Sequence, residues 1–130
     1  MILGIGIDLL NINRIEKFKN NERFLNRILS VSEKKEYKVL QKNHTKFLAK
    51  RFCVKEAFSK AIGTGIGRGI NFNDITLEKD ILGKPIISLN EKAISSLEEL
   101  FKINYDKLQI DVSTTDEDNY VNSFVVLSKN

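Results

Sequence analysis

The sequence predicts an α+β fold in which a mainly antiparallel sheet packs against a long central helix. A strand pattern at 2–10 is followed by helical patterns, and further strand patterns then surround one more helix. Strands and helices that come in separate runs favour α+β over a parallel α/β sheet. Residues 44–62 contain no proline and carry apolar side chains on several helical faces, which is typical of a buried helix.

The first strand is expected at 2–10, ILGIGIDLL, because its residues alternate strictly between two faces. One face carries the larger apolar residues, which are Leu3, Ile5, Ile7 and Leu9. The other face carries Gly4, Gly6 and Asp8. The two glycines allow a second backbone or a ligand to approach closely beside the Asp8 carboxylate, although a strand-end aspartate that faces water fits the pattern as well.

Helix starts are expected where a side chain can accept a hydrogen bond from the first turn. Asn13 followed by Glu16 resembles a capping box that opens a short helix. Ser32 is the expected N-cap of a second helix, EKKEYKVLQ. The central helix at 44–62 is expected to end at Gly63, because glycine tolerates the left-handed conformation of a helix C-cap.

The second half of the chain is expected to form two hairpins with one helix between them. A strand near Ile75 pairs with a strand at 86–89 across a Gly-Lys-Pro turn. Asn90 is the expected N-cap of the helix that follows. The last two strands are expected to flank the acidic turn at 116–118.

Length and composition indicate one soluble domain, residues 1–130. The single cysteine cannot form an internal disulfide, which fits a reducing, cytoplasmic compartment. Asp8 interrupts the apolar N-terminal segment and no basic segment precedes it, so a signal peptide is not expected. No apolar run approaches the length that crosses a membrane, and no membrane association is expected.

The charge is distributed unevenly along the chain. Residues 1–60 carry 14 Lys and Arg against 6 Asp and Glu, whereas residues 61–130 carry 7 against 11. A basic first half indicates an acidic partner, which can be a nucleic acid, a membrane surface, an acidic protein or a phosphorylated small molecule. A compositional bias toward lysine and asparagine would produce the same excess.

A run of four glycines at 63–69 follows the central helix. Nucleotide-binding loops of the two common types follow a strand and open a helix, whereas this run closes one. Backbone N–H groups in such a loop can still form an anion nest, and Arg51, Lys60 and Arg68 are close in sequence. Phosphate binding and a purely structural turn both remain open.

Two carboxylates are candidate metal ligands. Asp8 and Glu56 lie on elements expected to pack together, and Mg²⁺ typically takes one or two carboxylates plus water and phosphate oxygens. The alternative for Glu56 is a solvated ion pair with Lys60, four residues later. A zinc site is not expected, because His44 and Cys53 stand alone. No serine or cysteine nucleophile with a histidine partner can be assigned.

Several motifs together resemble one family. They are GIGID at 4–8, FLAKRFCVKEAFSKAIGTGIGRG at 47–69 and GKP at 83–85. These motifs are similar to those of holo-acyl-carrier-protein synthases, the short, trimeric class of 4′-phosphopantetheinyl transferase. The resemblance implies Mg²⁺-dependent transfer of phosphopantetheine from coenzyme A to a serine of acyl carrier protein, in fatty acid biosynthesis. It also implies release of adenosine 3′,5′-bisphosphate and a homotrimer with active sites between subunits.

The resemblance also implies roles for individual residues. Asp8 and Glu56 match the family's Mg²⁺ ligands. The residues that match coenzyme A phosphate contacts are Arg51, Lys60, Gly63, Thr64 and Gly65. The residues that match the docking surface for the acidic carrier protein are Arg14, Lys17, Arg23, Phe24 and Arg27. For the general base we favour Glu56 acting through a water on the metal, with Lys60 as the alternative.

One position departs from the family pattern. The family usually has a Ser/Thr-His pair before the last strand, and alignment on Tyr120 places Thr115-Asp116 there. Either a nearby residue replaces the histidine, or the alignment is shifted, or coenzyme A binds more weakly.

A different class of function is a non-catalytic basic module that binds RNA or another acidic surface. Aromatic residues on a strand face would support it, but the aromatic residues here follow mainly helical core patterns. The presence of both Asp8 and Glu56 favours the enzyme, and no nucleic acid partner is expected.

Overall fold

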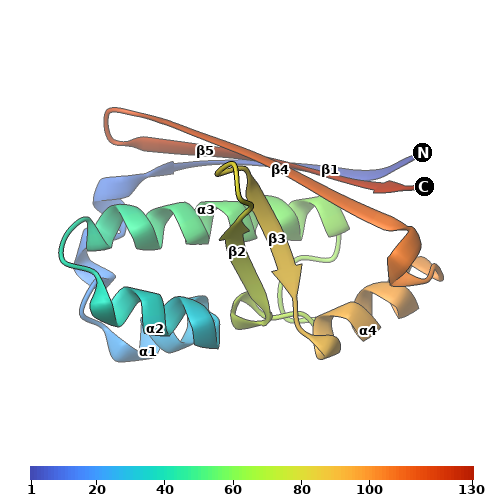
Figure 1. Ribbon diagram of the computed structural model, residues 1–130, viewed down its shortest axis with the longest axis horizontal. Helices are drawn as coiled ribbons and strands as arrows, with labels where there is room; N and C mark the ends of the chain where they lie inside the picture. The colour runs from blue at the N-terminus through green and yellow to red at the C-terminus, as the bar shows by residue number, and fades with distance from the viewer.

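The computed structural model describes residues 1–130. A three-stranded sheet lies along one side of a long helix, α3 (His44–Ile62), as Figure 1 shows. The sheet has the order β1-β5-β4, with β1 (Ile2–Asn11) and β4 (Leu108–Glu117) on either side of β5 (Tyr120–Lys129). All of its strand pairs are antiparallel. The predicted α+β class and the predicted central helix are therefore confirmed.

The remaining α-helices lie on the other side of α3 from this sheet (Figure 1). Two short helices, α1 (Glu22–Ile28) and α2 (Val31–Val39), lie beside the N-terminal half of α3. A separate antiparallel hairpin, β2 (Ile75–Lys79) and β3 (Pro85–Leu89), crosses the middle of α3 in this view and leads to α4 (Glu91–Phe101). Short 3₁₀ turns complete the chain at Ile12–Arg14, Glu16–Phe18, Phe72–Asp74 and Tyr105–Lys107.

Helix α3 packs directly onto the backbone of β1. A Cβ atom added at Gly4 would lie 1.9 Å from the Ala61 carbonyl oxygen, and one added at Gly6 would lie 1.8 Å from the Ala57 carbonyl oxygen. Any larger residue would therefore push the helix away from the strand. The space that the sequence predicted beside these glycines is filled by a second backbone, and Asp8 follows on the same face of β1.

The opposite face of β1 is apolar and exposed. Three of its side chains, Ile5, Ile7 and Leu9, are each more than half exposed. The neighbouring strand β5 adds Tyr120 and Phe124 to the same face, because Ile7 pairs with Phe124 in the sheet register. Leu3 was expected on this face, but a register shift between Ile2 and Gly4 interrupts the alternation, and Leu3 packs against the core.

The first expected helix start, at Asn13, was wrong. Asn11, not Asn13, accepts the capping hydrogen bond, and the segment forms two 3₁₀ turns instead of an α-helix. Glu16 does not close a capping box, because its carboxylate bonds to Lys19 and Thr45.

The second helix begins two residues earlier than expected. Ser30 is its N-cap, and a capping box joins Ser30 to Glu33, three residues later. Ser32 has a lysine at that spacing, and a lysine has no acceptor to complete the box.

Two other expected boundaries are confirmed, whereas the last turn comes later than expected, because β4 runs through Asp116 and Glu117. Gly63 ends α3 with φ of 82°, and Asn90 caps α4 by accepting a hydrogen bond from the Ala93 N–H at 2.9 Å. The last hairpin turns at Asp118, which adopts φ of 53°.

Candidate active site

Lys60 and Asp8 meet where β1 faces the C-terminal half of α3. The Lys60 Nζ donates to the Ile7 carbonyl oxygen at 2.9 Å and to Asp8 Oδ1 at 3.2 Å. The Asp8 side chain is mostly buried, whereas the Lys60 side chain is half exposed. The sequence predicted that the elements carrying Asp8 and Glu56 would pack together, and β1 does pack against α3; the contact between Lys60 and Asp8 was not predicted.

Glu56 lies one helical turn before Lys60 and faces the same site. Its pKa is raised above the ordinary value of 4.5, first by burial and then by the negative charge of Asp8. Lys60 and Arg27 act in the opposite direction. Two carboxylates in a half-buried site, one of which is repelled by the negative charge of the other, are a suitable donor set for a divalent cation. No third His, Cys, Asp or Glu groups with them, so Mg²⁺ fits this site better than a metal that needs a full protein cage.

The glycine loop lies at the C-terminal end of α3. Gly63, Gly65 and Gly67 all adopt positive φ, and a Cβ atom at any of them would meet nothing within 4 Å. Backbone conformation, not lack of space, therefore requires glycine at these three positions. The N–H groups of Gly63 and Gly67 donate within the loop, to Lys60 and Ile70, while those of Thr64 and Gly65 make no hydrogen bond within the chain. Thr64 and Gly65 are thus among the loop residues whose amides can receive an anion, together with Ile66, Arg68 and Gly69, whose N–H groups also make no hydrogen bond within the chain.

Arg51 lies far from this loop in the same chain. It comes twelve residues before Gly63 on one helix, which is a separation of about 18 Å along the axis. Its guanidinium lies 3.6 Å from the Phe47 ring centre and donates to Glu36 at 3.3 Å. Its Nε is buried, lies 3.8 Å from the Glu33 carboxylate and has no hydrogen-bond partner. The structure does not bring Arg51 together with Lys60 and the loop within one subunit.

Arg51 instead belongs to a basic cluster that sequence reasoning missed. Burial lowers the pKa of Lys50, and so do the positive charges of Lys79, Arg51 and Lys46. Lys46 and Lys50 are spaced i and i+4 on α3, and that spacing could have indicated a shared face. A group of cations that repel one another is a site where a bound anion would relieve the repulsion.

Asp116 faces this basic cluster. It pairs with Val121 in the hairpin register, so its side chain is on the same face of the sheet as Asp8. Its carboxylate lies 3.4 Å from the Lys46 Nζ. Its negative charge partly offsets the lowering of the Lys50 pKa by burial and by the neighbouring cations. Asp116 is therefore near cations at the edge of the sheet, not in the site formed by Asp8 and Glu56.

Three of the expected docking residues line one hollow. Arg14 and Lys17 stand at its edge, and Phe24 stacks on Phe18 with ring centres 4.3 Å apart. The hollow has a volume of about 450 Å³ and is lined by Leu10, Asn13, Arg14, Ile15, Lys17, Phe18, Phe24 and Phe52. Arg23 and Arg27 are exposed on α1 beside it, and Arg27 is close enough to Glu56 to lower that residue's pKa. The basic surface therefore adjoins the two carboxylates.

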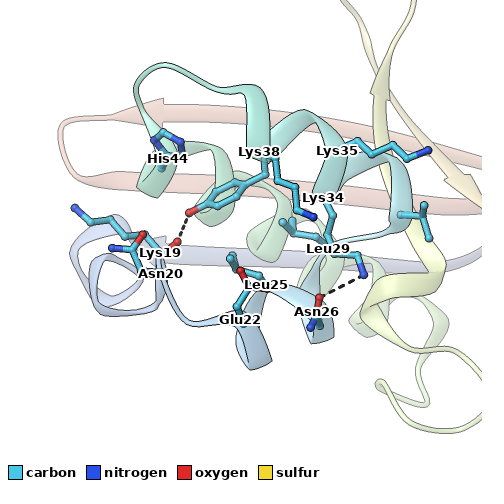
Figure 2. Close-up of a pocket in the computed structure, with 12 residues that line it drawn as sticks. Lys19, Asn20, Glu22, Leu25, Asn26, Leu29, Lys34, Lys35, Lys38 and His44 are labelled. Carbon is cyan, nitrogen blue, oxygen red and sulfur yellow. Dashed lines mark hydrogen bonds between the residues drawn. The ribbon is translucent and has the colours of Figure 1, made fainter.

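A second hollow lies between α1 and α2 and was not expected from the sequence. Its volume is about 430 Å³, and Figure 2 shows Leu25 and Leu29 beside it with several lysines around it. The lysines are Lys19, Lys34, Lys35 and Lys38. Near one end the Tyr37 hydroxyl donates to the Lys19 carbonyl oxygen at 2.5 Å. This hollow is on another face of α1 from the docking residues.

Comparison with known proteins identifies the family. The sequence profile of the 4′-phosphopantetheinyl transferase superfamily matches residues 4–121. The holo-[acyl-carrier-protein] synthase of Staphylococcus epidermidis is 42% identical over 134 residues, which cover 100% of this chain and 99% of the relative. This chain belongs to the 4′-phosphopantetheinyl transferase superfamily. The family predicted from the sequence is therefore confirmed, and the chain is an enzyme of the phosphopantetheinyl transferase class.

Solved structures of holo-[acyl-carrier-protein] synthases share the fold of this transferase. The protein from Neisseria meningitidis has a TM-score of 0.86 and 37% identity, covering 99% of this chain and 100% of the other. The protein from Bacillus anthracis, solved in complex with CoA (3′,5′-ADP), has a TM-score of 0.78 and 37% identity, covering 100% of this chain and 99% of the other.

Two further observations concern the membrane and RNA partners considered from the sequence. None of the helices is long and apolar enough to cross a membrane. Tyr120 and Phe124 do lie on an exposed strand face, but the neighbouring outward side chains are apolar, acidic or neutral, and none is Lys or Arg. That face lacks the positive charge that RNA binding requires.

Proposed function

We propose that this transferase moves the 4′-phosphopantetheine group of coenzyme A to a serine of an apo acyl carrier protein. The reaction depends on Mg²⁺, releases adenosine 3′,5′-bisphosphate and serves fatty acid biosynthesis in the cytoplasm, with residues 1–130 as one transferase domain. The observation that carries the proposal is the meeting of Asp8, Glu56 and Lys60 beside Arg27 of the basic surface. Phosphate chemistry and an acidic protein partner would come together there.

Asp8 and Glu56 would hold the Mg²⁺ ion. When bound, Mg²⁺ neutralises the pyrophosphate and stabilises the charge that develops as the phosphorus–oxygen bond breaks. Glu56 is the proposed general base for the serine proton, because its carboxylate lies beside Asp8 and close to Arg27 of the basic surface that would receive the carrier. Lys60, the alternative base, is better suited to hold a phosphate oxygen, since its ammonium already bonds to oxygen acceptors.

The coenzyme phosphates would bind between subunits. Lys60 and the free amides of Thr64 and Gly65 lie at one end of α3, and Gly63 supplies the turn between them. Arg51 and the lysines around it lie too far away to contact the same pyrophosphate in one chain. A neighbouring subunit that presents its Arg51 cluster to this loop would complete the site.

The exposed apolar face of the sheet supports this homotrimer. Contiguous exposed apolar residues on a protein surface mark sites of association. The residues that would be covered by neighbouring subunits are Ile5, Ile7, Leu9, Tyr120 and Phe124.

The acyl carrier protein would dock on the basic surface formed by the residues Arg14, Lys17, Arg23, Phe24 and Arg27. The arginines and the lysine would steer an acidic helix, and the apolar hollow around Phe24 would receive its apolar side chains.

The experiment is direct. The protein is incubated with coenzyme A, Mg²⁺ and an apo acyl carrier protein, and the carrier is weighed by mass spectrometry. We expect the carrier to gain the mass of one phosphopantetheine group, and chelation of Mg²⁺ to prevent the gain. A carrier of unchanged mass under these conditions would reject the proposal, and light scattering separately tests the trimer.

A further inference from the structure

Lys55 is fully buried although it carries an ammonium group. Its side chain is 0% exposed, and its Nζ donates to the Ile28 carbonyl oxygen at 2.6 Å and to Glu33 Oε1 at 2.5 Å. A charge in such a place is expensive unless it is paired and hydrogen-bonded. Lys55 directly precedes Glu56 in α3, yet it serves no part of the proposed reaction.

Its partner Glu33 is equally buried and uses both carboxylate oxygens. Oε1 accepts from the Ser30 N–H at 2.9 Å as well as from Lys55, and Oε2 accepts from the Leu77 N–H at 3.0 Å. The pair therefore joins four elements: the end of α1, the start of α2, strand β2 and helix α3.

Helix α1 depends on such a connection because it has only seven residues. An isolated helix of this length is unstable in water, and its last four carbonyl groups lack partners within the helix. Lys55 satisfies the Ile28 carbonyl, and the Asn73 side chain donates to the Asn26 carbonyl at 3.3 Å. A cation at this end also interacts favourably with the helix dipole.

Packing supports α1 on only part of its surface. Leu25, Ile28 and Leu29 are buried in the core, but Leu25 and Leu29 also border the hollow between α1 and α2 (Figure 2). Apolar contacts have no preferred direction, so they fix the distance between the end of α1 and α3 less sharply than a hydrogen bond does. The hydrogen bond from Lys55 has a preferred direction, and it fixes Ile28, the residue that follows Arg27.

We propose that Lys55 and Glu33 are positioning residues that fix the end of α1, and with it Arg27 and the basic surface, relative to Glu56 on α3. The link acts through one side chain: Lys55 is adjacent to Glu56 in sequence and bonded to the neighbour of Arg27. The carrier protein therefore meets a docking surface that is already set at its working distance from the reacting groups. This role rests on the proposed function of the basic surface.

The test compares Lys55→Met with a matched control. Methionine keeps most of the volume and removes the charge and the donor, while Glu33 keeps its bonds to two backbone amides. The control is Leu127→Ala, a buried residue of β5 in the other core cluster, which lowers stability without touching α1. We expect Lys55→Met to raise KM for the carrier on the order of tenfold, because a displaced docking group loses alignment, with KM for coenzyme A unchanged. Equal KM values for the carrier in the variant and the control would overturn the proposal.

Amide hydrogen exchange gives a readout that needs no activity. In Lys55→Met the amides of residues 25–29 should exchange faster than those of α3, whereas in Leu127→Ala they should not. If Lys55→Met does not fold, the double variant Glu33→Gln/Lys55→Met removes both charges together, keeps a side-chain oxygen that can accept from a backbone amide, and is read in the same way.

The wild-type protein provides the remaining check. Its residues 25–29 should be protected as strongly as the middle of α3, because the two segments open together. Independent, earlier exchange of α1 in the wild type would contradict the proposal whatever the variants do. Failure of the carrier-modification assay with normal exchange behaviour would instead reject the proposed function alone.

Discussion

The ammonium group of Lys60 lies 3.2 Å from the Asp8 carboxylate, on the face of β1 that packs against α3. The contact places a cation against one of the two proposed Mg²⁺ ligands. Lys60 and a metal would therefore compete for the negative charge of Asp8. The competition is mild, because the lysine side chain is 54% exposed and an ion pair of this kind contributes little.

This contact predicts opposite effects on binding and turnover. Lys60→Met should tighten Mg²⁺ binding by roughly two- to fivefold, because an exposed pair contributes at most about 1 kcal/mol. The same variant should transfer phosphopantetheine much more slowly, since a phosphate contact is lost. Titration calorimetry with Mg²⁺ alone measures the first effect. Unchanged turnover would show that Lys60 neither binds a phosphate of coenzyme A nor accepts the serine proton.

Loss of either carboxylate should abolish transfer while the fold is retained. Asp8→Ala and Glu56→Ala each remove half of the protein's proposed donor set for Mg²⁺. Circular dichroism should stay close to that of the wild type, because neither side chain is part of the apolar core. Near-normal turnover of Glu56→Ala at ordinary Mg²⁺ concentration would remove the metal hypothesis.

Glu56 should make the metal-free protein less stable as pH rises. Its folded-state pKa lies above 4.5, so the folded state binds the proton more tightly than the unfolded state does. The free energy of unfolding therefore falls with pH from about 4.5 up to the raised pKa, and the loss persists above it. Glu56→Gln should remove this loss, which partial exposure limits to less than about 1 kcal/mol. Thermal unfolding in a chelator between pH 4 and pH 8 measures it, and an identical pH profile for both proteins would contradict the assignment.

Charge reversal on the basic surface should affect one substrate only. Arg14→Glu or Arg23→Glu should raise KM for the carrier protein far more than KM for coenzyme A, because exposed charges steer an acidic partner. The difference should shrink as salt is added. Steady-state kinetics at two ionic strengths provides the measurement. Equal changes for both substrates would place these arginines in the coenzyme site instead.

Asp116 should weaken coenzyme A binding. It lies 3.4 Å from Lys46 in the basic cluster that contains Arg51, so its charge would oppose a phosphate bound there. Asp116→His should lower KM for coenzyme A several-fold, a change on the order of 1 kcal/mol, and Asp116→Asn should give part of that gain. KM for the carrier should hardly change. If neither variant alters coenzyme A binding, Asp116 serves only to pair with Lys46.

The fold was largely predictable because its signals are local. The proline-free segment 44–62 and the glycine after it indicated the bounds of α3, and Asn90 marked the start of α4. The cap at Ser30 was missed because the glutamate three residues later was not matched to it. The alternation of β1 predicted a strand but not which face is buried, since only the packing of α3 decides that the glycine face turns inward.

The site was predictable only in part because long-range pairing leaves no mark in a single sequence. Motif resemblance selected Asp8, Glu56 and Lys60, and the structure brings them together. Neither the motif nor the spacing indicated that Arg51 packs against Glu33 and Glu36 on α2. The face occupied by Asp116 depends on the register of the last hairpin, which a shift of one residue would reverse.

The distance between the two proposed metal ligands depends on Gly6, a residue without a side chain. Asp8 stands on β1 and Glu56 on α3, and these elements approach closely because Gly6 has no side chain. A single methyl group at that position would lie 1.8 Å from the Ala57 carbonyl oxygen, and the strand and the helix would have to separate. Gly6 has no functional group and would be ignored by any search for reactive side chains. It nonetheless sets the spacing between β1 and α3, and the chemistry proposed for Asp8 and Glu56 would depend on it as much as on the carboxylates themselves.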